Sequence, residues 1–260
     1  MRILVTNDDG IHAPGLALLE DIARQLSDDV WVVAPAEEMS GAGHSLTLTQ
    51  PIRLRRESDT RYAVRGTPTD CVMMALGHIM RDARPDILLS GINRGANLAE
   101  DVTYSGTVSA AMEGTLYGVR AIALSQATSN PQTGETDFDA ARHWALPVLR
   151  QLLDAPWTPG VLLNVNFPPV PAAEVTGVRA TEQGFRDIGQ TKIVERVDVR
   201  GFPYYWFGLG REAQMPGHDT DLKAMRTGAI SVTPLHLDLT HRPMIREIDG
   251  ALAGVARPKL

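Results

Sequence analysis

The chain has 260 residues, 43% of them hydrophobic and 22% charged, which is ordinary for a globular protein with a sizeable core. Its formal net charge of -6 argues against a broad nucleic-acid-binding face, because such a face needs a positive field, yet it permits a small anionic ligand in one pocket. The chain has one cysteine, Cys71, which excludes an internal disulfide. The amino terminus lacks the charged, apolar and small-residue regions of a signal peptide. No apolar run reaches the roughly 18 residues of a membrane span. We therefore expect a cytoplasmic protein that makes no membrane contact.

The first residues predict the start of an α/β fold. A short apolar run at 3–5 ends in polar turn residues, which is typical of a buried parallel strand. Apolar residues then recur at helical spacing over 16–26, and a second strand-like run at 30–34 stops at Pro35. The order strand, loop, helix, strand is the beginning of an α/β architecture.

The next segment predicts a hairpin and then a helix, at 52–56, 62–65 and 67–80. Thr67 has the side chain of a helix cap, and Pro68 suits the first helical position. Asp70 lies in the first turn, where the helix dipole favours a negative charge. These three residues fix where the helix begins.

Strands and helices continue to alternate up to residue 168, which predicts a mostly parallel sheet flanked by helices. The expected elements are strands at 86–90, 121–124 and 161–167, helices at 108–116 and 137–153, and a long Gly- and Asn-rich loop at 91–106. Beyond residue 168 the strand-like segments have long, irregular connections, and they lie at 177–181, 203–208 and 229–235. We therefore expect one domain, 1–260, with a regular core at 1–168 and a C-terminal elaboration at 169–260, whose strands and helix supply arms used in oligomerisation.

Polar residues follow three of the expected strands. They are Asn7, Asp8 and Asp9 after the first, Ser40, Gly41, Gly43, His44 and Ser45 after the second, and Ser90, Gly91, Asn93, Asn97, Ser105, Gly106 and Thr107 at the end of the third and beyond it. In open parallel sheets, ligands bind beyond the carboxyl ends of the strands. This topology therefore brings residues far apart in the sequence to one edge of the sheet.

Asp8 and Asp9 are the sharpest feature of this edge. Two adjacent carboxylates at the end of a buried strand repel each other, and a hard divalent cation that prefers oxygen ligands relieves the repulsion. The Ser40 hydroxyl and the Asn93 amide oxygen would add two neutral ligands. Alone, the Asp-Asp-Gly sequence favours a solvated turn. Together with the preceding strand and the other polar loops, it favours a metal site.

Ser105, Gly106 and Thr107 precede a helix rich in small residues. Free backbone amides, the helix dipole and two hydroxyls there suit a phosphate group, and Asn97 would add an amide donor. An ordinary helix cap explains the same residues equally well, and Asn97 can simply shape the loop. We call these four residues the phosphate cradle.

His44 is a candidate for phosphate contact or proton transfer, although a loop histidine without a chemical role is an equal alternative. The sequence contains no HExxH pattern, which argues against zinc. It also lacks a GxGxxG after the first strand and a Walker sequence, which argues against dinucleotide and ATP-loop proteins. Cys71 lies one turn into a helix and is expected to be a buried apolar residue.

Several stretches resemble the SurE family, in order along nearly the whole chain. They are ILVTNDDGIHAPG at 3–15, VAP at 33–35 with SGAGHS at 40–45, GTPTDC at 66–71, SGINRGAN at 90–97 running into YSGT at 104–107, NVNFP at 164–168, YYW at 204–206 and SVTPL at 231–235. Any one of them alone is only moderately specific. Their combination is what carries the resemblance.

The resemblance implies a Rossmann-like core with a carboxyl-terminal extension exchanged between the subunits of a homodimer or homotetramer. It implies one divalent ion per subunit, Mn²⁺ or Mg²⁺, with the family's metal ligands on Asp8, Asp9, Ser40 and Asn93. The family hydrolyses nucleoside 5'- and 3'-monophosphates, and some members also cleave short polyphosphate. We expect no stable complex with nucleic acid. Arg94 occupies a position that we expect to be small or variable, so it is expected to alter the choice of substrate.

We therefore predict a divalent-metal-dependent 5'-nucleotidase, in which a metal-bound water attacks the phosphate in line and the phosphate cradle stabilises the equatorial oxygens. One carboxylate of Asp8 and Asp9 accepts the proton of this water, and the sequence leaves open which. A receiver domain, which also has an early acidic pair, needs a phosphorylatable Asp at the end of the third strand, where this chain has Ser90. A non-catalytic nucleotide- or RNA-binding protein on the same fold stays open.

Overall fold

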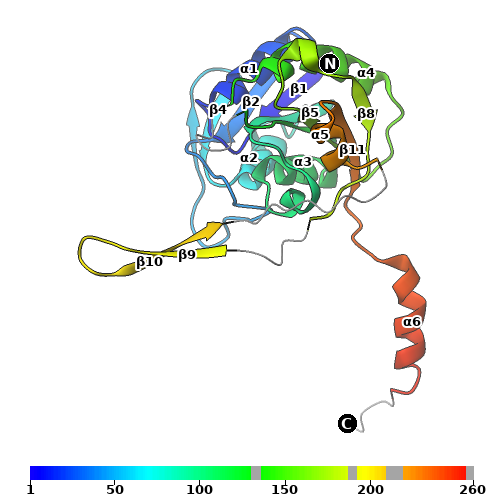
Figure 1. Ribbon diagram of the computed structural model, residues 1–260. Helices are drawn as coiled ribbons and strands as arrows, with labels where there is room; N and C mark the ends of the chain where they lie inside the picture. The colour runs from blue at the N-terminus through cyan, green and yellow to red at the C-terminus, as the bar shows by residue number, and fades with distance from the viewer. Residues whose placement is uncertain (130–135, 187–191, 209–218, 256–260) are drawn as a thin grey trace.

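The computed structural model describes residues 1–129, 136–186, 192–208 and 219–255 (Figure 1). Within these residues, one nine-stranded sheet forms the centre of the fold. Its strands are β1 (Arg2–Thr6), β2 (Asp29–Pro35), β3 (Arg53–Arg56), β4 (Arg61–Arg65), β5 (Ile87–Arg94), β6 (Arg120–Gln126), β7 (Val161–Phe167), β8 (Val178–Ala180) and β11 (Ile230–His236). They lie side by side in the order β3-β4-β2-β1-β5-β6-β7-β11-β8.

The sheet is mostly parallel, as predicted. The six strands from β4 to β7 are parallel neighbours, whereas β3 pairs antiparallel with β4 at one edge. β11 pairs antiparallel with β7, and β8 pairs parallel with β11. Beyond residue 168, β11 and β8 thus extend the central sheet.

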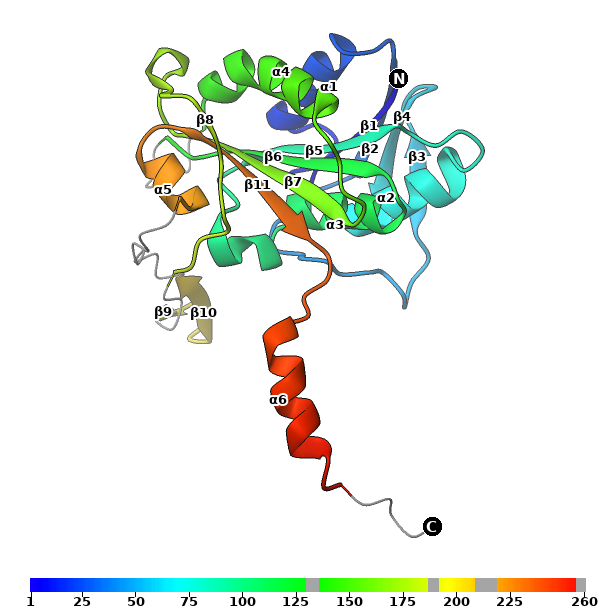
Figure 2. The same ribbon diagram turned by 90° about the vertical axis from the view of Figure 1, so that its right-hand side faces the viewer.

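Helices cover both faces of the sheet (Figure 2). α1 (Pro14–Arg24) and α4 (Asp139–Asp154) lie on one face, and α2 (Pro68–Met74) and α3 (Gly106–Leu116) lie on the other. Each face has its own buried apolar cluster, with Leu19 and Leu149 in the first and Val72 and Val108 in the second. A short helix, α5 (Asp221–Arg226), packs near β11. The structure is an α/β fold with helices on both faces, as the sequence predicts.

Two predicted boundaries are wrong. The helix expected to continue to residue 80 ends at Met74 and is followed by a π-helical turn, Ala75–Ile79, in which the Met80 amide donates to the Ala75 carbonyl at 2.7 Å. β5 does not stop at residue 90 but runs to Arg94, past Gly91. A side chain at Gly91 would lie 2.2 Å from the Leu124 carbonyl oxygen, so only glycine lets the strand pass β6 here. The loop before α3 is correspondingly shorter, and Ala99–Thr103 forms a 3₁₀ turn.

Two segments project from this compact body (Figure 1). β9 (Lys192–Val197) and β10 (Pro203–Gly208) form a separate antiparallel hairpin. Helix α6 (Arg242–Leu252) leaves the body in another direction and has no buried residue. We call this hairpin and α6 the arms. The strand expected at 203–208 is confirmed, while β9, α5 and α6 do not appear among the elements predicted by residue range.

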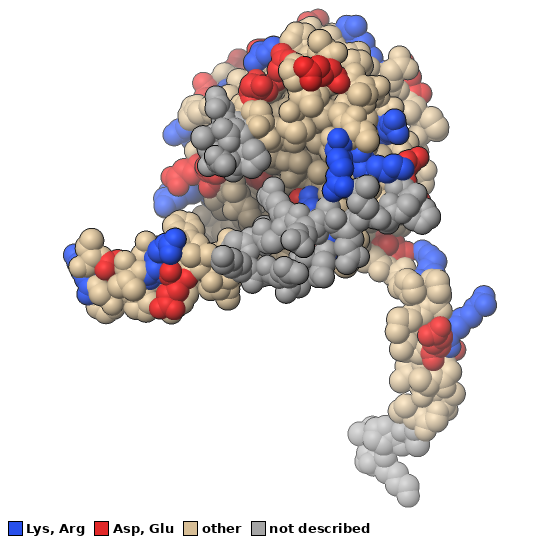
Figure 3. All heavy atoms as spheres, viewed as in Figure 1, with Lys and Arg blue, Asp and Glu red and all other residues tan. Residues whose placement is uncertain are grey.

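Charge is dispersed over the body. On the face drawn in Figure 3, the coloured acidic and basic side chains alternate, and most of α6 is neither. In the described part of the chain, no helix has the length and apolar character needed to cross a membrane. Cys71 is fully buried, as expected, and burial raises the pKa of its thiol well above the ordinary value.

Candidate functional site

The loops after β1 and β2 fold against each other at the carboxyl edge of the sheet. Asn7 donates from Nδ2 to the Gly10 carbonyl at 2.9 Å, which closes the turn around Asp8 and Asp9. Gly10 has φ of +100°, and its Cα faces the backbone of Glu37 so closely that a Cβ would lie 3.2 Å from it. The Met39 amide donates to the Asp8 carbonyl at 2.8 Å. Ser40 is therefore carried to the same edge as the acidic pair.

Asp8 is buried against the start of α3. Only 4% of its surface is exposed, and its Oδ1 accepts a hydrogen bond from the Thr107 hydroxyl at 2.5 Å. A Cβ at Gly106 would lie 2.8 Å from the Asp8 Cβ, so α3 can approach this closely only with glycine there. Burial raises the pKa of Asp8 to about 6, against the opposing effect of the Thr107 hydrogen bond, and the charge of Asp9 adds to the rise.

Asp9 is held from the other side by β5. Its Oδ2 accepts from the Arg94 backbone amide at 3.0 Å, and burial raises its pKa although Arg94 opposes the rise. The Arg94 guanidinium lies 3.3 Å from Glu38, and Ser40 donates to the same Glu38 oxygen at 2.9 Å. Arg94 thus holds Asp9 through its backbone amide and the Ser40 loop through the contact of its side chain with Glu38.

The oxygen atoms gathered here fit a divalent cation. Asn93 uses its Nδ2 to donate to the Gly95 carbonyl at 2.8 Å, which leaves its Oδ1 as an acceptor. The Ser40 oxygen keeps lone pairs after donating to Glu38, and the buried Asn7 Oδ1 has no partner among the described residues. In those residues no three His, Cys, Asp or Glu side chains cluster, so an ion here would need neutral oxygens beside the two carboxylates.

The start of α3 combines the two roles that the sequence left open. Ser105 is the helix cap, because its Oγ accepts from the Val108 amide at 3.0 Å. Its own hydroxyl hydrogen is not consumed by that bond. Thr107 is fully buried and donates to Asp8, so the helix start and the acidic pair form one unit.

Asn97 lies farther along the same edge, over β6 and β7. Its Nδ2 donates to the Ser125 hydroxyl at 2.8 Å, and its backbone amide donates to the Asn166 Oδ1 at 2.8 Å. Asn164 donates to the Asn97 carbonyl at 2.8 Å. The second hydrogen on the Asn97 Nδ2 is the group left for a ligand, and the rest of the residue shapes the loop.

His44 contacts the helix whose start holds Asp8. The His44 Nε2 lies 2.9 Å from an oxygen of Glu113, a buried residue on α3. A Cβ at the neighbouring Gly43 would lie 3.6 Å from the Thr103 carbonyl oxygen, just before α3. The loop that carries His44 therefore runs along the first turns of this helix.

Residues that the sequence did not indicate also shape this edge. Asp221, which is fully buried, accepts from the Ala99 amide at 2.8 Å and from the Gly184 amide at 2.8 Å, and so holds the loop that carries Asn97. Burial raises the pKa of Asp221. The sequence could have indicated Glu38, because it is an acidic residue in the polar loop after β2. The contacts of Asp221 join residues 122 and 37 positions apart, so no local pattern indicates them.

Comparison with known proteins places this site in context. A family model described as "Survival protein SurE" matches residues 3–190. A protein of Rhizorhabdus wittichii named 5'-nucleotidase SurE is 59% identical over 242 residues, which cover 93% of this chain and 95% of that protein. A protein of the same name from Parvibaculum lavamentivorans is 52% identical over 259 residues, covering 100% and 94%. The crystal structure of the SurE protein from Aquifex aeolicus superposes with a TM-score of 0.82 at 37% identity, covering 96% and 99%.

Proposed function

Because the chain belongs to the SurE family, we propose that it is a 5'-nucleotidase, an enzyme that hydrolyses nucleoside 5'-monophosphates to nucleoside and phosphate. The proposal extends to 3'-monophosphates and short polyphosphate. The observation that carries it is the burial of Asp8 against the start of α3, which joins an acidic pair to a helix N-terminus. Helix N-termini favour phosphate, and the acidic pair favours a cation that phosphate also binds.

We propose one Mn²⁺ or Mg²⁺ ion per subunit, with Asp8, Asp9, Ser40 and Asn93 as its protein ligands. When bound, such an ion lowers the pKa of a water molecule and withdraws charge from a phosphate oxygen. Burial disfavours the negative charges of Asp8 and Asp9, and in the described residues Arg94 supplies one positive charge against these two. A divalent ion would balance that deficit.

The protein's own groups position the phosphate. We propose that the backbone amide at Gly106, the Ser105 hydroxyl and the free hydrogen of the Asn97 amide donate to its oxygens, where negative charge grows in the transition state, and that Thr107 contributes beside them while its hydroxyl and amide hold Asp8. One carboxylate of the acidic pair accepts the proton of the attacking water. We propose that His44, whose Nε2 lies 2.9 Å from Glu113, contacts the phosphate or assists proton transfer.

We propose that the chain is one domain, in which 1–168 is the core and 169–260 supplies the arms of a homodimer or homotetramer in the cytoplasm. The arms expose large apolar side chains that a second copy would cover, among them Trp206 at 64% and Phe207 at 77%. Exposed apolar patches of this kind mark protein interfaces. Nucleic acid is not a proposed partner, because the net charge is -6.

Phosphate release from AMP and GMP tests the activity, measured with EDTA, Mg²⁺ or Mn²⁺. We expect turnover only with the ion, and a loss of at least about 100-fold in Asp8→Asn, because several kcal/mol of charge stabilisation disappear. Asp82→Asn, at an exposed acid in a surface turn, is the matched control and keeps full activity. A wild-type protein that releases no phosphate with any metal would contradict the proposal and favour a non-catalytic binding protein.

A further inference from the structure

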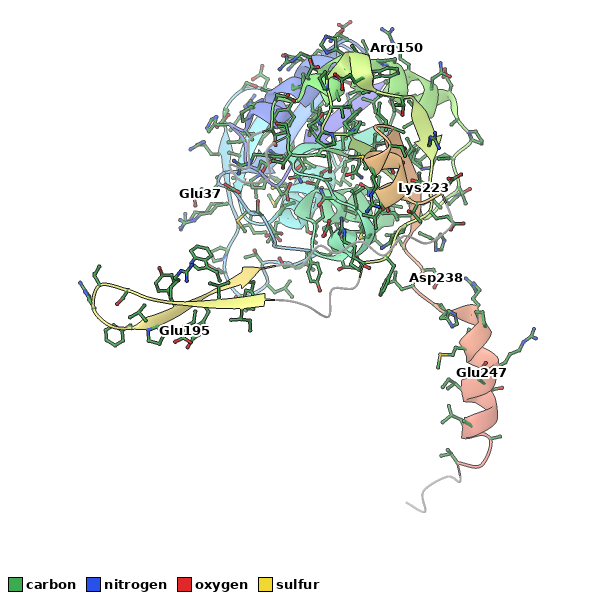
Figure 4. The ribbon with its side chains drawn as sticks, in the orientation of Figure 1. Glu37, Arg150, Glu195, Lys223, Asp238 and Glu247 are labelled. Atoms are coloured by element: carbon green, nitrogen blue, oxygen red, sulfur yellow. The ribbon has the colours of Figure 1, made fainter. Side chains whose placement is uncertain are left out.

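A cleft of about 460 Å³ lies beside the candidate site rather than in it. The β3–β4 hairpin forms one wall, through Arg53 and Arg65, and the loop after β2 forms the other, through Glu37 and Met39. Gln50 closes one end. Figure 4 shows Glu37 at the outer margin of the body, on the side away from Lys223 of α5. A smaller cavity of about 320 Å³ shares both arginines and Glu37 and continues along the hairpin.

The two arginines of this cleft are an uncompensated pair. Arg53 and Arg65 are direct partners in the antiparallel ladder, so their side chains leave the same face of the hairpin roughly 5 Å apart at Cβ. Like charges directly opposite each other destabilise a sheet. Arg55, Arg56 and Arg61 of the same hairpin each lie within 3.3 Å of a carboxylate, whereas neither Arg53 nor Arg65 has an acidic partner in the described residues. The unpaired arginines are the two that face the larger cavity.

The cleft is continuous with the carboxyl edge of the sheet. β4 ends at Arg65, and its Val64 is level with Pro35 of β2. Just beyond the turn that carries Asp8, the Ile11 amide donates to the Pro35 carbonyl at 2.7 Å. β4 is two strands from β1, which is roughly 10 Å at the usual spacing between strands. Met39 lines the cleft, and its backbone amide donates to the Asp8 carbonyl. The loop that carries Ser40 therefore lies between the cleft and the acidic pair and contacts both.

We propose that this cleft is a subsite for a second phosphate group of the substrate, beside the phosphate that is cleaved. Two guanidinium groups suit phosphate, because each presents a fork of donors to its oxygens. Glu37 reduces the net charge of the cleft to that of one cation, which suits a single phosphate rather than a long polyanion. This inference rests on the proposed phosphatase activity at Asp8. It predicts that substrates with a second phosphate group bind more tightly than those with one.

Two probes separate the sources of a second phosphate: adenosine 3',5'-bisphosphate carries it across a ribose, and tripolyphosphate carries it along a chain. We would measure kcat and KM for both, and for AMP, with wild type, Arg53→Gln, Arg65→Gln and the double variant. In each single variant we expect the ratio of kcat/KM for a two-phosphate probe to that for AMP to fall about tenfold, mostly through KM, as for loss of one charge-assisted hydrogen bond. Arg56→Gln removes an equal charge from the same hairpin outside the cleft and leaves the ratio unchanged.

The outcomes are distinct. A fall for the bisphosphate alone assigns the subsite to nucleotides, a fall for tripolyphosphate alone assigns it to polyphosphate, and a fall for both leaves the shared phosphate chemistry. Unchanged ratios in the double variant would overturn the subsite, as would an equal loss with AMP. If wild type cleaves none of the three, the proposed activity fails by itself. Calorimetric titration of both probes into wild type and the double variant then decides the subsite, and equal affinities would refute it.

Discussion

At the carboxyl edge of the sheet, two carboxylates are taken out of water, whereas on the arms large apolar side chains are left in it. Asp8 is 4% exposed and burial raises its pKa to about 6. Trp206 on the hairpin is 64% exposed, and Ile248 on α6 is 49% exposed. Figure 4 shows both arms standing clear of the body, with Glu195 on one and Glu247 on the other. The single chain therefore leaves buried negative charge unbalanced at the edge of the sheet and apolar surface exposed to water on the arms.

The difference lies in what would relieve each cost. A buried acidic pair is relieved by a positive charge small enough to enter a polar pocket, which is the property of a divalent ion. Exposed apolar side chains are relieved by an apolar surface of similar extent, which is the property of another protein copy. The body and the arms thus point to a ligand and to an interface respectively, and each can be altered without altering the other.

The largest effect is expected on the arms. Ile245→Glu with Ile248→Glu puts two charges on the apolar stripe of α6 and removes burial worth about 1.5–3 kcal/mol for each side chain. Light scattering after size exclusion should show the oligomer falling to a smaller species, while AMP hydrolysis per chain persists. Arg246→Ala, on the same helix, is the control. An unchanged mass in the double variant would show that α6 is not part of the interface.

A large effect is also expected where α3 meets Asp8. In Gly106→Ala the new Cβ would lie 2.8 Å from the Asp8 Cβ and 3.1 Å from Pro68, so the helix start must move. We expect activity to fall about 100-fold and stability by about 1–3 kcal/mol, as for displacement of a reacting group and overpacking. Gly77→Ala, with nothing within 4 Å of its Cβ, is the control. Full activity in Gly106→Ala would contradict this tight contact.

A moderate effect is expected from pH in the metal-free protein. The pKa of Asp8 rises from 3.8 to about 6 on folding, so the folded chain binds the proton more tightly and its stability falls as pH rises through that range. In EDTA, urea unfolding should show wild type losing about 1–2 kcal/mol from pH 4.5 to 7.5 relative to Asp8→Asn, which does not ionise. A difference of opposite sign would mean that the buried carboxylate is stabilised as an anion.

The smallest effect is expected on the exposed side of the hairpin. Arg56 and Asp59 form an ion pair 2.5 Å apart, but their side chains are 60% and 94% exposed. Exposed pairs of this kind contribute roughly 0–1 kcal/mol. Thermal unfolding of Arg56→Gln should therefore match wild type closely. A clear loss of stability would mean that this pair orders the hairpin and would weaken Arg56→Gln as a control for the cleft.

Much of the fold follows from local sequence. Thr67 accepts from the Asp70 amide at 3.1 Å and Asp70 accepts from the Thr67 amide at 2.8 Å, so the predicted helix start is a complete capping box. The first strand and its polar turn likewise appear where the apolar run ends, with Asp8 and Asp9 just after β1. In both cases the determining residues lie within a stretch of seven residues.

The rest depends on contacts between distant residues. β5 can continue past residue 90 because Gly91 has no Cβ to clash with the Leu124 carbonyl on the neighbouring strand. No local pattern reveals this contact. His44 pairs with Glu113, 69 residues away, a contact that its sequence position did not reveal. The apolar side chains of β9 have no core beneath them, whereas Met244, Ile245, Ile248 and Leu252 recur at helical spacing, so α6 carried a local signal that the sequence analysis did not assign to a residue range.

Manganese binding tests the proposed metal site on Asp8 and Asp9 without any knowledge of the substrate. Free Mn²⁺ would be measured by electron paramagnetic resonance during titration of the metal-free protein at pH 7.5, with wild type, Asp9→Asn and the control Asp82→Asn. We expect about one ion per chain in wild type and the control, and an affinity at least about tenfold lower in Asp9→Asn. Binding of equal strength in all three proteins, or none in wild type, would contradict a metal site on the buried acidic pair.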